Sequence, residues 1–354
     1  MRKHRLPSLI AAVALFFMLA GAAQAALPAR VTFATLPTGS GNNAMATALA
    51  KVASDHSGIL VVTRPGSSHS AWVTSTSERG SPELGFAHIL DVWWGFSGKL
   101  SPTPLPGDPY GTAPFYTPSP NLRMLIAGPG QRVGMVVRRD APWQNLTDAK
   151  GQSVAGGFTA HAGAYSSLVA AMMAENLLES RDFKLVPVPS VGASIGALTE
   201  GRADIAVGGV GTAPIAEANS RTPVRFLNVP HDAESQARVK QAFPGAEVAL
   251  FTGRAPGVTE DTWLVTYPLI VTASTHLSEA AAYALVKSWW ENYEETRAMH
   301  ASFADWGPDK FMIRNATIPF HDGAIRFFKE KGIWDADMDR IQAELLAGEF
   351  PFLK

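Results

Sequence analysis

The chain has 354 residues, with 30 Lys and Arg against 31 Asp and Glu, a formal net charge of −1, and no cysteine. This charge balance does not favour nucleic-acid binding, and the lack of cysteine excludes disulfides, thiolate metal sites and a cysteine nucleophile. Hydrophobic residues make up 46% of the chain, enough for a large core, and the length predicts about two domains.

Residues 1–25 have the pattern of a secretory signal peptide. Basic Arg2, Lys3 and Arg5 precede an apolar run from Leu9 to Leu19, and Ala23-x-Ala25 is a small-residue cleavage site. The apolar run is shorter than the roughly 20 residues that cross a bilayer. We therefore expect cleavage after Ala25, no lipid tether, and a mature chain that works in the periplasm. Removing three basic residues leaves 27 (30 − 3) against 31 acidic ones, a net charge of −4.

Short apolar strands alternate with helical segments after the signal peptide. This alternation predicts α/β layers with mostly parallel sheets. Glu83 and Asp204 occupy matching places in two stretches of similar layout, which indicates two related lobes. Strands are predicted at 31–35, 59–63, 84–88, 124–127, 133–137, 153–155, 184–188 and 204–207, and helices at 44–53, 164–178 and 193–199.

A long apolar strand at 262–272 leads into a helical C-terminal region, and it could return the chain to the first lobe. Lobe 1 is therefore predicted to comprise 26–137 plus 263–354, and lobe 2 to comprise 138–262. Residues 101–120 hold seven of the 25 prolines, too many for a helix or a central strand. We expect a long surface loop there, and a plain excursion is favoured over the alternative of a lid.

Two glycine-rich loops lead from a strand into a helix. Gly39-Ser-Gly41-Asn-Asn-Ala44 nearly matches the dinucleotide fingerprint, but a periplasmic compartment does not supply that cofactor. Without a dinucleotide, the motif still places backbone N–H groups at a helix start, where they can bind an anion. The loop at 156–167 is a second candidate of the same kind, and the two loops are expected to face each other across a cleft.

An enzyme is a weaker alternative. Gly192-Ala-Ser194-Ile-Gly196 matches the nucleophile elbow of esterases, but Pro189-Ser-Val191 separates the motif from its strand. Three histidines (His231, His300 and His321) could each act as the base, and nothing selects one. The nine histidines show no His-x-x-x-His spacing, so we expect no metal site and no cofactor.

The segment Thr317-Ile-Pro-Phe-His-Asp-Gly-Ala-Ile-Arg-Phe-Phe-Lys-Glu-Lys-Gly-Ile-Trp334 resembles the C-terminal signature of the TAXI family, the solute-binding subunits of tripartite ATP-independent periplasmic (TRAP) transporters. Residues 31–51 and 145–154 are similar to two further stretches of that family. The resemblance implies an α/β type II periplasmic binding protein fold, with two lobes and a ligand cleft between them. It also implies a binding protein rather than an enzyme, a membrane permease driven by an ion gradient, and small carboxylate ligands.

The chain departs from the family pattern at the ligand loops. Where the family usually has Gly, Thr and paired Tyr, this chain has Ser40, Gly41, Asn42 and Asn43. Ser67 and Ser68 are followed by His69, and His88 stands where Gln is frequent. Glutamate, one of the small carboxylates bound in that family, is therefore not expected as the ligand. A differently shaped organic anion is expected.

The predicted ligand site combines loops of both lobes. Arg64 or Arg132 could pair with a carboxylate of the ligand. We expect a monomeric periplasmic receptor that binds a small organic anion, most simply a carboxylate, and delivers it to the TRAP permease subunits; a secreted esterase using Ser194 and a periplasmic ligand sensor are the alternatives. The predicted binding residues are Thr38, Gly39, Ser40, Asn42, Asn43, Ser67, Ser68 and His88 from lobe 1, and Phe158, Thr159, His161, Tyr165, Gly209 and Thr212 from lobe 2.

Overall fold

The computed structural model describes residues 26–38, 40–66, 68–98, 117–158, 162–304 and 306–351. The predicted signal peptide and most of the proline-rich stretch at 101–120 lie outside these residues. Within the described ranges, no helix has the length and apolar character needed to cross a membrane.

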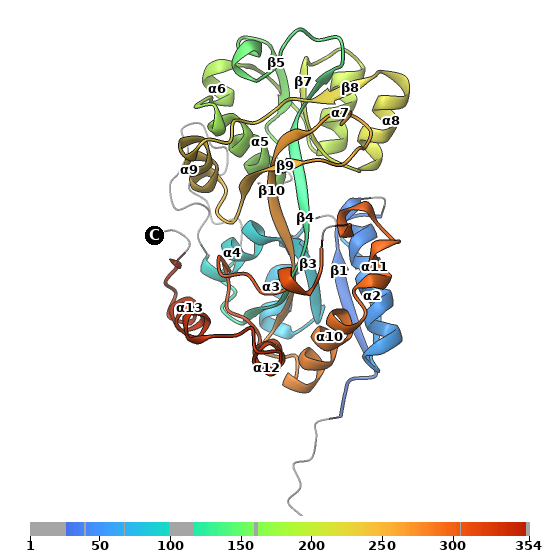
Figure 1. The fold of residues 1–354 in the computed structure, drawn as a ribbon, viewed down its shortest axis with the longest axis vertical. Helices are drawn as coiled ribbons and strands as arrows, with labels where there is room; N and C mark the ends of the chain where they lie inside the picture. The colour runs from blue at the N-terminus through green and yellow to red at the C-terminus, as the bar shows by residue number, and fades with distance from the viewer. Residues whose placement is uncertain are drawn as a thin grey trace, which may run out of the picture.

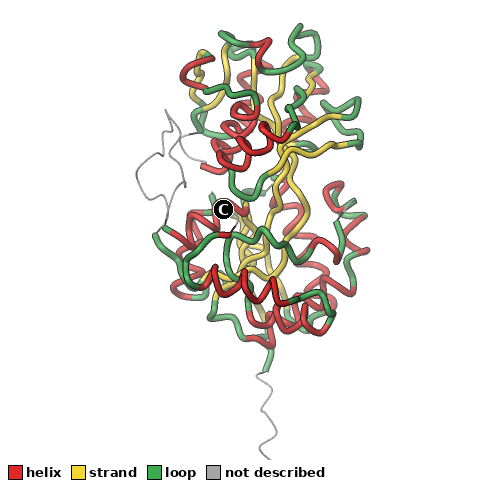
Figure 2. Tube along the Cα trace, turned by 60° about the vertical axis from the view of Figure 1, so that its left-hand side comes forward, coloured by secondary structure: helices red, strands yellow, loops and turns green. Residues whose placement is uncertain are grey.

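Two lobes are connected by two long strands that run through both of them (Figures 1 and 2). These strands, β4 (Leu122–Arg138) and β10 (Thr262–Ser274), pair antiparallel along most of their length. They lie at the centre of the described sheet, whose strand order is β2-β1-β3-β10-β4-β7-β5-β6. The predicted α/β class with two lobes is confirmed.

The first lobe contains the parallel strands β1 (Arg30–Thr35), β2 (Leu60–Pro65) and β3 (Leu84–His88), with β1 between the other two. The chain returns to this lobe along β10, and its C-terminal helices pack there (Figure 1). The indole N–H of Trp289 donates to the Leu49 carbonyl at 2.9 Å, which joins the first and last thirds of the chain. The helices of this lobe are α2 (Gly41–His56), α3 (Ser70–Arg79), α4 (Ile89–Ser97), α10 (Glu279–Glu291), α11 (Glu294–Arg297), α12 (Asp322–Glu330) and α13 (Ala336–Leu346), with 3₁₀ turns η2 (Ala301–Phe303) and η3 (Pro308–Lys310).

The second lobe repeats the pattern of strand followed by helix. Its parallel strands are β5 (Ser153–Gly156), β6 (Lys184–Pro187) and β7 (Ile205–Gly209), and β7 pairs antiparallel with β4. The remaining elements are η1 (Thr147–Ala149), α5 (Ala162–Ala174), α6 (Glu179–Asp182), α7 (Val191–Thr199), α8 (Ala213–Arg221), β8 (Val224–Phe226), α9 (Ala233–Ala242) and β9 (Glu247–Phe251).

Equivalent carboxylates connect the strands of each lobe. Glu83 Oε2 accepts the backbone N–H of Thr32 at 2.7 Å, which ties the start of β3 to β1. Asp204 Oδ2 accepts the backbone N–H of Ser153 at 3.1 Å, which ties the start of β7 to β5. The matching positions of Glu83 and Asp204 in the sequence therefore correspond to the same contact in both lobes.

The prediction of two strands at 124–127 and 133–137 is wrong, because β4 is continuous over both. The Gly128-Pro129-Gly130 segment suggested a break. In the ladder with β10, Ala127 faces Ile270 and Gly130 faces Pro268, so two residues of β4 lie opposite one of β10. This β-bulge accommodates a proline that a regular central strand would exclude.

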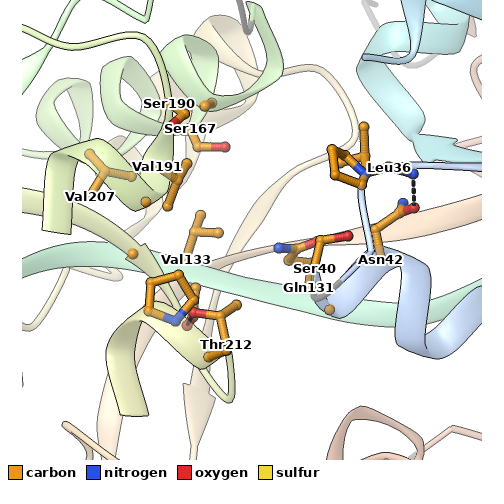
Figure 3. A pocket seen from close by; sticks show the side chains of 18 of the residues that line it. Leu36, Ser40, Asn42, Gln131, Val133, Ser167, Ser190, Val191, Val207 and Thr212 are labelled. Carbon is orange, nitrogen blue, oxygen red and sulfur yellow. Dashed lines mark hydrogen bonds between the residues drawn. The ribbon is translucent and has the colours of Figure 1, made fainter. Parts of the chain in front are cut away.

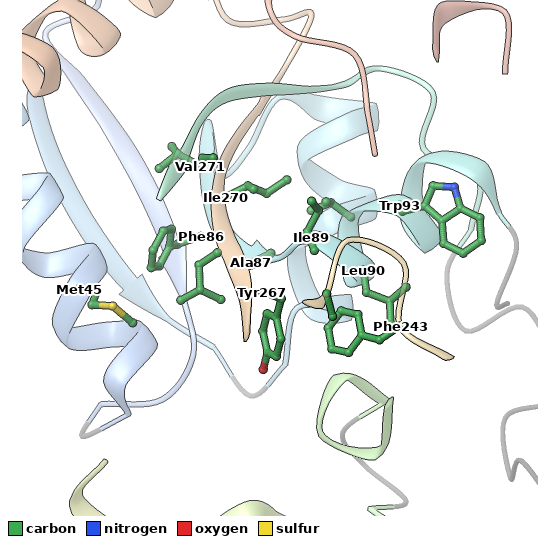
Figure 4. Packing of buried hydrophobic residues seen from close by; sticks show 14 of the residues in the cluster. Met45, Phe86, Ala87, Ile89, Leu90, Trp93, Phe243, Tyr267, Ile270 and Val271 are labelled. Carbon is green, nitrogen blue, oxygen red and sulfur yellow. The ribbon is translucent and has the colours of Figure 1, made fainter. Parts of the chain in front are cut away.

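The hydrophobic core continues from one lobe into the other. Tyr267 of β10 packs against Phe243, which follows α9, with ring centroids 4.5 Å apart. Figure 4 shows this pair beside Ile89 and Leu90 of α4. All four side chains are buried. The strands that connect the lobes are therefore also the strands on which both lobes pack.

A cavity between the lobes as the candidate functional site

A cavity of about 440 Å³ lies between the two lobes. In Figure 3, Leu36, Ser40 and Asn42 lie on one side of it, and Ser190, Val191 and Val207 lie on the other. Gln131 and Val133 of β4 lie between the two sides. The lining residues are Leu36, Pro37, Thr38, Ser40, Gly41, Asn42, His88, Gln131, Val133, Ala164, Ser167, Ser190, Val191, Gly192, Val207, Gly208, Gly209, Thr212, Ala213, Pro214, Glu217 and Tyr267.

Several helices begin at this cavity. The N-cap residues of α2, α4, α7 and α8 are Ser40, His88, Ser190 and Thr212, and all four line it. The third residue of α5, Ala164, lines it as well. The first N–H groups of a helix have no partner within the helix, and the macrodipole is positive at this end. The cavity therefore has the polarity that favours an anion.

Asn42 fixes the first loop instead of offering its side chain to the cavity. Its Oδ1 accepts the backbone N–H of Leu36 at 2.9 Å, and its Nδ2 donates to the Phe86 carbonyl at 3.0 Å (Figure 3). The side chain is buried. It thus connects the end of β1, the start of α2 and β3. What remains available to a ligand at this position is the helix start itself.

His88 is backed by a buried carboxylate. Asp91 Oδ2 lies 3.2 Å from His88 Nδ1 and 2.9 Å from His69 Nδ1, and all three side chains are at most 4% exposed. Burial opposes the ionisation of Asp91, but His69 and then His88 outweigh it and hold the pKa of Asp91 well below its usual range. Burial lowers the pKa of His88, and the hydrogen bond to Asp91 opposes that shift. A neutral imidazole beside a carboxylate is therefore the favoured state at neutral pH.

Further polar groups at the cavity come from α5 and from the strands that connect the lobes. Ser167 of α5 donates its hydroxyl hydrogen bond to the Tyr267 hydroxyl at 3.4 Å, which joins the second lobe to β10. Burial raises the pKa of Tyr267, so its hydroxyl stays protonated. The buried Oε1 of Gln131 has no hydrogen-bond partner among the described residues. It is an acceptor that a ligand or water can satisfy.

The described lining contains no lysine or arginine. The two candidate cations lie elsewhere: Arg64 is exposed at the end of β2, and the Arg132 guanidinium lies over the Phe251 ring at 4.9 Å from its centroid. Glu217 is the one carboxylate among the described lining residues, and it is exposed. A bound anion would therefore be held by helix starts and neutral polar groups.

The structure brings six of the predicted binding residues together at the cavity. Four others are described but are not among its lining residues. Asn43 donates through Nδ2 to Thr35 Oγ1 at 2.8 Å. Phe158 is fully buried, and Tyr165 is buried at a separate small pocket. The residues at the cavity are Thr38, Ser40, Asn42, His88, Gly209 and Thr212; those away from it are Asn43, Ser68, Phe158 and Tyr165; Gly39, Ser67, Thr159 and His161 lie outside the described residues.

Ser194 does not have the environment of an esterase nucleophile. Its side chain is fully buried in α7. The hydroxyl donates to the Ala155 carbonyl at 2.8 Å and accepts the backbone N–H of Val207 at 3.0 Å. It therefore joins β5, α7 and β7. A nucleophile elbow exposes its serine at a strand-to-helix turn, so the esterase alternative is wrong.

The contributions of α7 and of the connecting strands to the cavity were not predicted from the sequence. Ser190, Val191 and Gly192 line the cavity at the start of α7, and Gln131 and Tyr267 come from β4 and β10. A signal for the first group was present, because serine is a frequent N-cap and Ser190 lies three residues before the predicted helix start at 193. The inward direction of Gln131 had no signal, since it depends on the register between β4 and β10.

The sequence of residues 109–332 matches the model of the NMT1-like family. None of the curated proteins compared with the chain matches it.

Among solved structures, the periplasmic binding protein BugD is 13% identical, with 90% of this chain and 95% of that chain covered at a TM-score of 0.50. The R. palustris protein Rpa4515, solved with adipate, is 14% identical, with 91% and 98% covered at a TM-score of 0.49. The periplasmic sulfonate-binding protein SsuA of Methylobacillus flagellatus is 15% identical, with 90% and 94% covered at 0.48. The likeness to BugD shows a shared fold.

Proposed function

This chain belongs to the NMT1-like family, and we propose that it is a periplasmic solute-binding protein that captures a small organic anion between its lobes. The observation that carries the proposal is the convergence of four helix N-caps on one cavity. A helix start stabilises a carboxylate or a similar group through backbone N–H donors and the macrodipole. The role is binding and delivery rather than catalysis.

The proposed ligand combines an anionic group with an apolar body. Leu36, Val133, Val191 and Val207 give the cavity apolar surface on both sides, while the helix starts provide polar groups. A cavity of about 440 Å³ is in the range of small-molecule sites. A carboxylate of modest size fits both properties.

The proposed partner is a membrane permease of the TRAP type, in line with the resemblance of residues 317–334 to the TAXI signature. The division into 26–137 plus 263–354 and 138–262, with hinge motion about β4 and β10, is part of this proposal. So are cleavage after Ala25 and a monomeric receptor.

A charge placed at a cavity helix start tests the anion. Ser190 and Ser278 are both N-cap residues. The Oγ of each accepts a hydrogen bond of 3.2 Å from the backbone N–H of the residue three positions later. Ser190 lines the cavity, whereas Ser278, at the start of α10, is not among its lining residues. Aspartate is as good a cap as serine. Ser190→Asp is therefore expected to weaken anion binding by about 10-fold or more through charge repulsion, while Ser278→Asp leaves it unchanged.

The measurement is a thermal-shift screen of mono- and dicarboxylates, sulfonates and amino acids, followed by calorimetry on compounds that stabilise the chain. Both variants are compared on the tightest binder. If no anion in the panel stabilises the chain, the proposal fails. Equal loss of affinity in both variants would also count against a role for the α7 start.

A further inference from the structure

We propose that His69, His88 and Asp91 form a binding site for one divalent transition-metal ion of the Zn²⁺ class. Each residue offers one ligand atom, and these three atoms lie within 4.8 Å of one another. The residues come from separate places in the fold: His69 precedes α3, His88 ends β3, and Asp91 lies in the first turn of α4. His88 and Asp91 are only three residues apart at the junction of β3 and α4, so two backbone segments bring the metal-ligating side chains to one point.

The two distances from the carboxylate oxygen to the imidazole nitrogens are close to those around a tetrahedral ion. Asp91 Oδ2 is 2.9 Å from His69 Nδ1 and 3.2 Å from His88 Nδ1. Ligand atoms about 2.1 Å from Zn²⁺ at tetrahedral angles lie about 3.4 Å apart. Small rotations of the two imidazole rings, whose centroids are 4.7 Å apart, would supply the difference.

The donor set selects the class of metal. Two imidazole nitrogens and one carboxylate oxygen are typical ligands of Zn²⁺ and of the neighbouring first-row ions. Ca²⁺ and Mg²⁺ prefer oxygen ligands in larger number, which this cluster does not offer. Neutral imidazole and carboxylate are also the forms of these side chains that bind metal ions.

The three side chains are shielded from solvent. Side-chain exposure is 1% for His69, 4% for His88 and 3% for Asp91. The Trp72 ring lies 6.1 Å from that of His69, and the Tyr267 ring lies 5.0 Å from that of His88, so aromatic groups form part of the outer shell. An apolar shell controls solvent access and strengthens electrostatic interactions at a metal.

The site adjoins the cavity through His88, which lines it. Three protein ligands leave one position of a tetrahedral ion open, as in many functional zinc sites. A bound ion would place positive charge beside a cavity whose described lining contains no lysine or arginine.

Titration with Zn²⁺ alone tests the site without any organic ligand, so its outcome is separate from that of the proposed function. The mature chain, free of a histidine tag and stripped with EDTA, is titrated calorimetrically. We expect saturation at one equivalent, and no comparable binding of Mg²⁺ or Ca²⁺. Asp91→Asn and His88→Gln are each expected to weaken Zn²⁺ binding by about 100-fold or more, because even residues that only support metal ligands contribute 10- to 100-fold.

His56→Gln is the matched control. His56 Nε2 lies 2.9 Å from Glu295 Oε1, which repeats a His–carboxylate pair at the surface. Within the described ranges this pair is not part of a group of three ligating side chains. The control is expected to keep full affinity. Co²⁺ provides a readout that needs no variant, because a tetrahedral N/O site gives visible absorption bands that saturate at one equivalent. Absence of saturable Zn²⁺ binding, an unchanged affinity in folded Asp91→Asn and His88→Gln, or a loss in His56→Gln would overturn the proposal.

Discussion

Glu179 shows how a single carboxyl group can couple this fold to pH. The residue begins α6, is 8% exposed, and accepts the backbone N–H of Gly157 at 3.1 Å through Oε1. Burial raises its pKa to about 7, and the hydrogen bond from Gly157 only partly opposes that shift. Below about pH 7 the protonated form is therefore favoured in the folded chain.

The sign of this linkage is fixed by the raised pKa. From about pH 4.5 to about pH 7 the folded chain holds a proton that the unfolded chain has released, so the free energy of unfolding falls as pH rises. Glu179→Gln removes this fall. From pH 5 to pH 8 the unfolding free energy of the parent chain should therefore drop by about 2 kcal/mol more than that of the variant. Urea unfolding at both pH values measures it, with exposed Glu260→Gln as the control. Identical pH dependence in all three chains would contradict the assignment.

Local chemistry decided which of the predicted binding residues lie at the cavity and which are buried in packing. Ser40, His88 and Thr212 reached the cavity because each caps a helix directly after a strand or loop, a pattern that the sequence displays. Phe158 and Tyr165 belong to an equally suggestive loop, yet both side chains are buried in packing. An aromatic side chain gains more from burial than from facing a cavity, and the sequence does not show which one will.

Among the elements, α12 is held against α10 at a contact that requires glycine. A Cβ on Gly323 would lie 2.3 Å from the Glu279 carbonyl and 2.7 Å from the Tyr283 nitrogen. Because these are backbone atoms, Gly323→Ala must displace one helix from the other. The expected loss of stability is about 1–3 kcal/mol.

Gly192 is the control for this substitution, since both glycines are the second residue of their helix. The nearest atoms to a Cβ on Gly192 are 3.9 Å and 4.0 Å away. Gly192→Ala should therefore keep or slightly raise the unfolding free energy, because alanine favours a helix. Urea unfolding of both variants measures the difference, and an equal effect would exclude close packing at Gly323 as the cause.

The elements themselves were largely predictable, because apolar periodicity and capping residues are local signals. The single strand β4 was not, since Gly128-Pro129-Gly130 indicates a turn when read alone. Only the partner strand β10 makes the bulge that carries this proline. The register between β4 and β10 also decides that Gln131 reaches the cavity, and such a register is a long-range property.

At the scale of the whole molecule, the lobes approach each other at Gly41 of α2 and Thr212 before α8. A Cβ on Gly41 would lie 3.9 Å from Thr212 Cγ2. The chain contains no cysteine, so a pair introduced here has no competing thiol. We expect the double variant Gly41→Cys/Thr212→Cys to form a disulfide on mild oxidation and to hold the two lobes together.

Thiol counting before and after oxidation measures the bond, and ligand exchange is then compared in the two states. The oxidised chain should take up and release its anion much more slowly, and reduction should restore exchange. The two single variants are the controls. Free thiols after oxidation would contradict the approach of the lobes, and unchanged exchange in the locked chain would contradict entry by opening of the lobes.

The helix N-caps around the cavity have an effect even when no ligand is bound. Each helix start carries roughly half a positive charge, and the proposed closure of the lobes would bring those of α2 and α4 towards those of α7 and α8. Like partial charges repel, so closure of the ligand-free chain is electrostatically opposed. An anion between the lobes acts as their shared counterion and converts this repulsion into attraction to both. The same charges that are proposed to bind the solute would thereby oppose full closure of the lobes until it arrives.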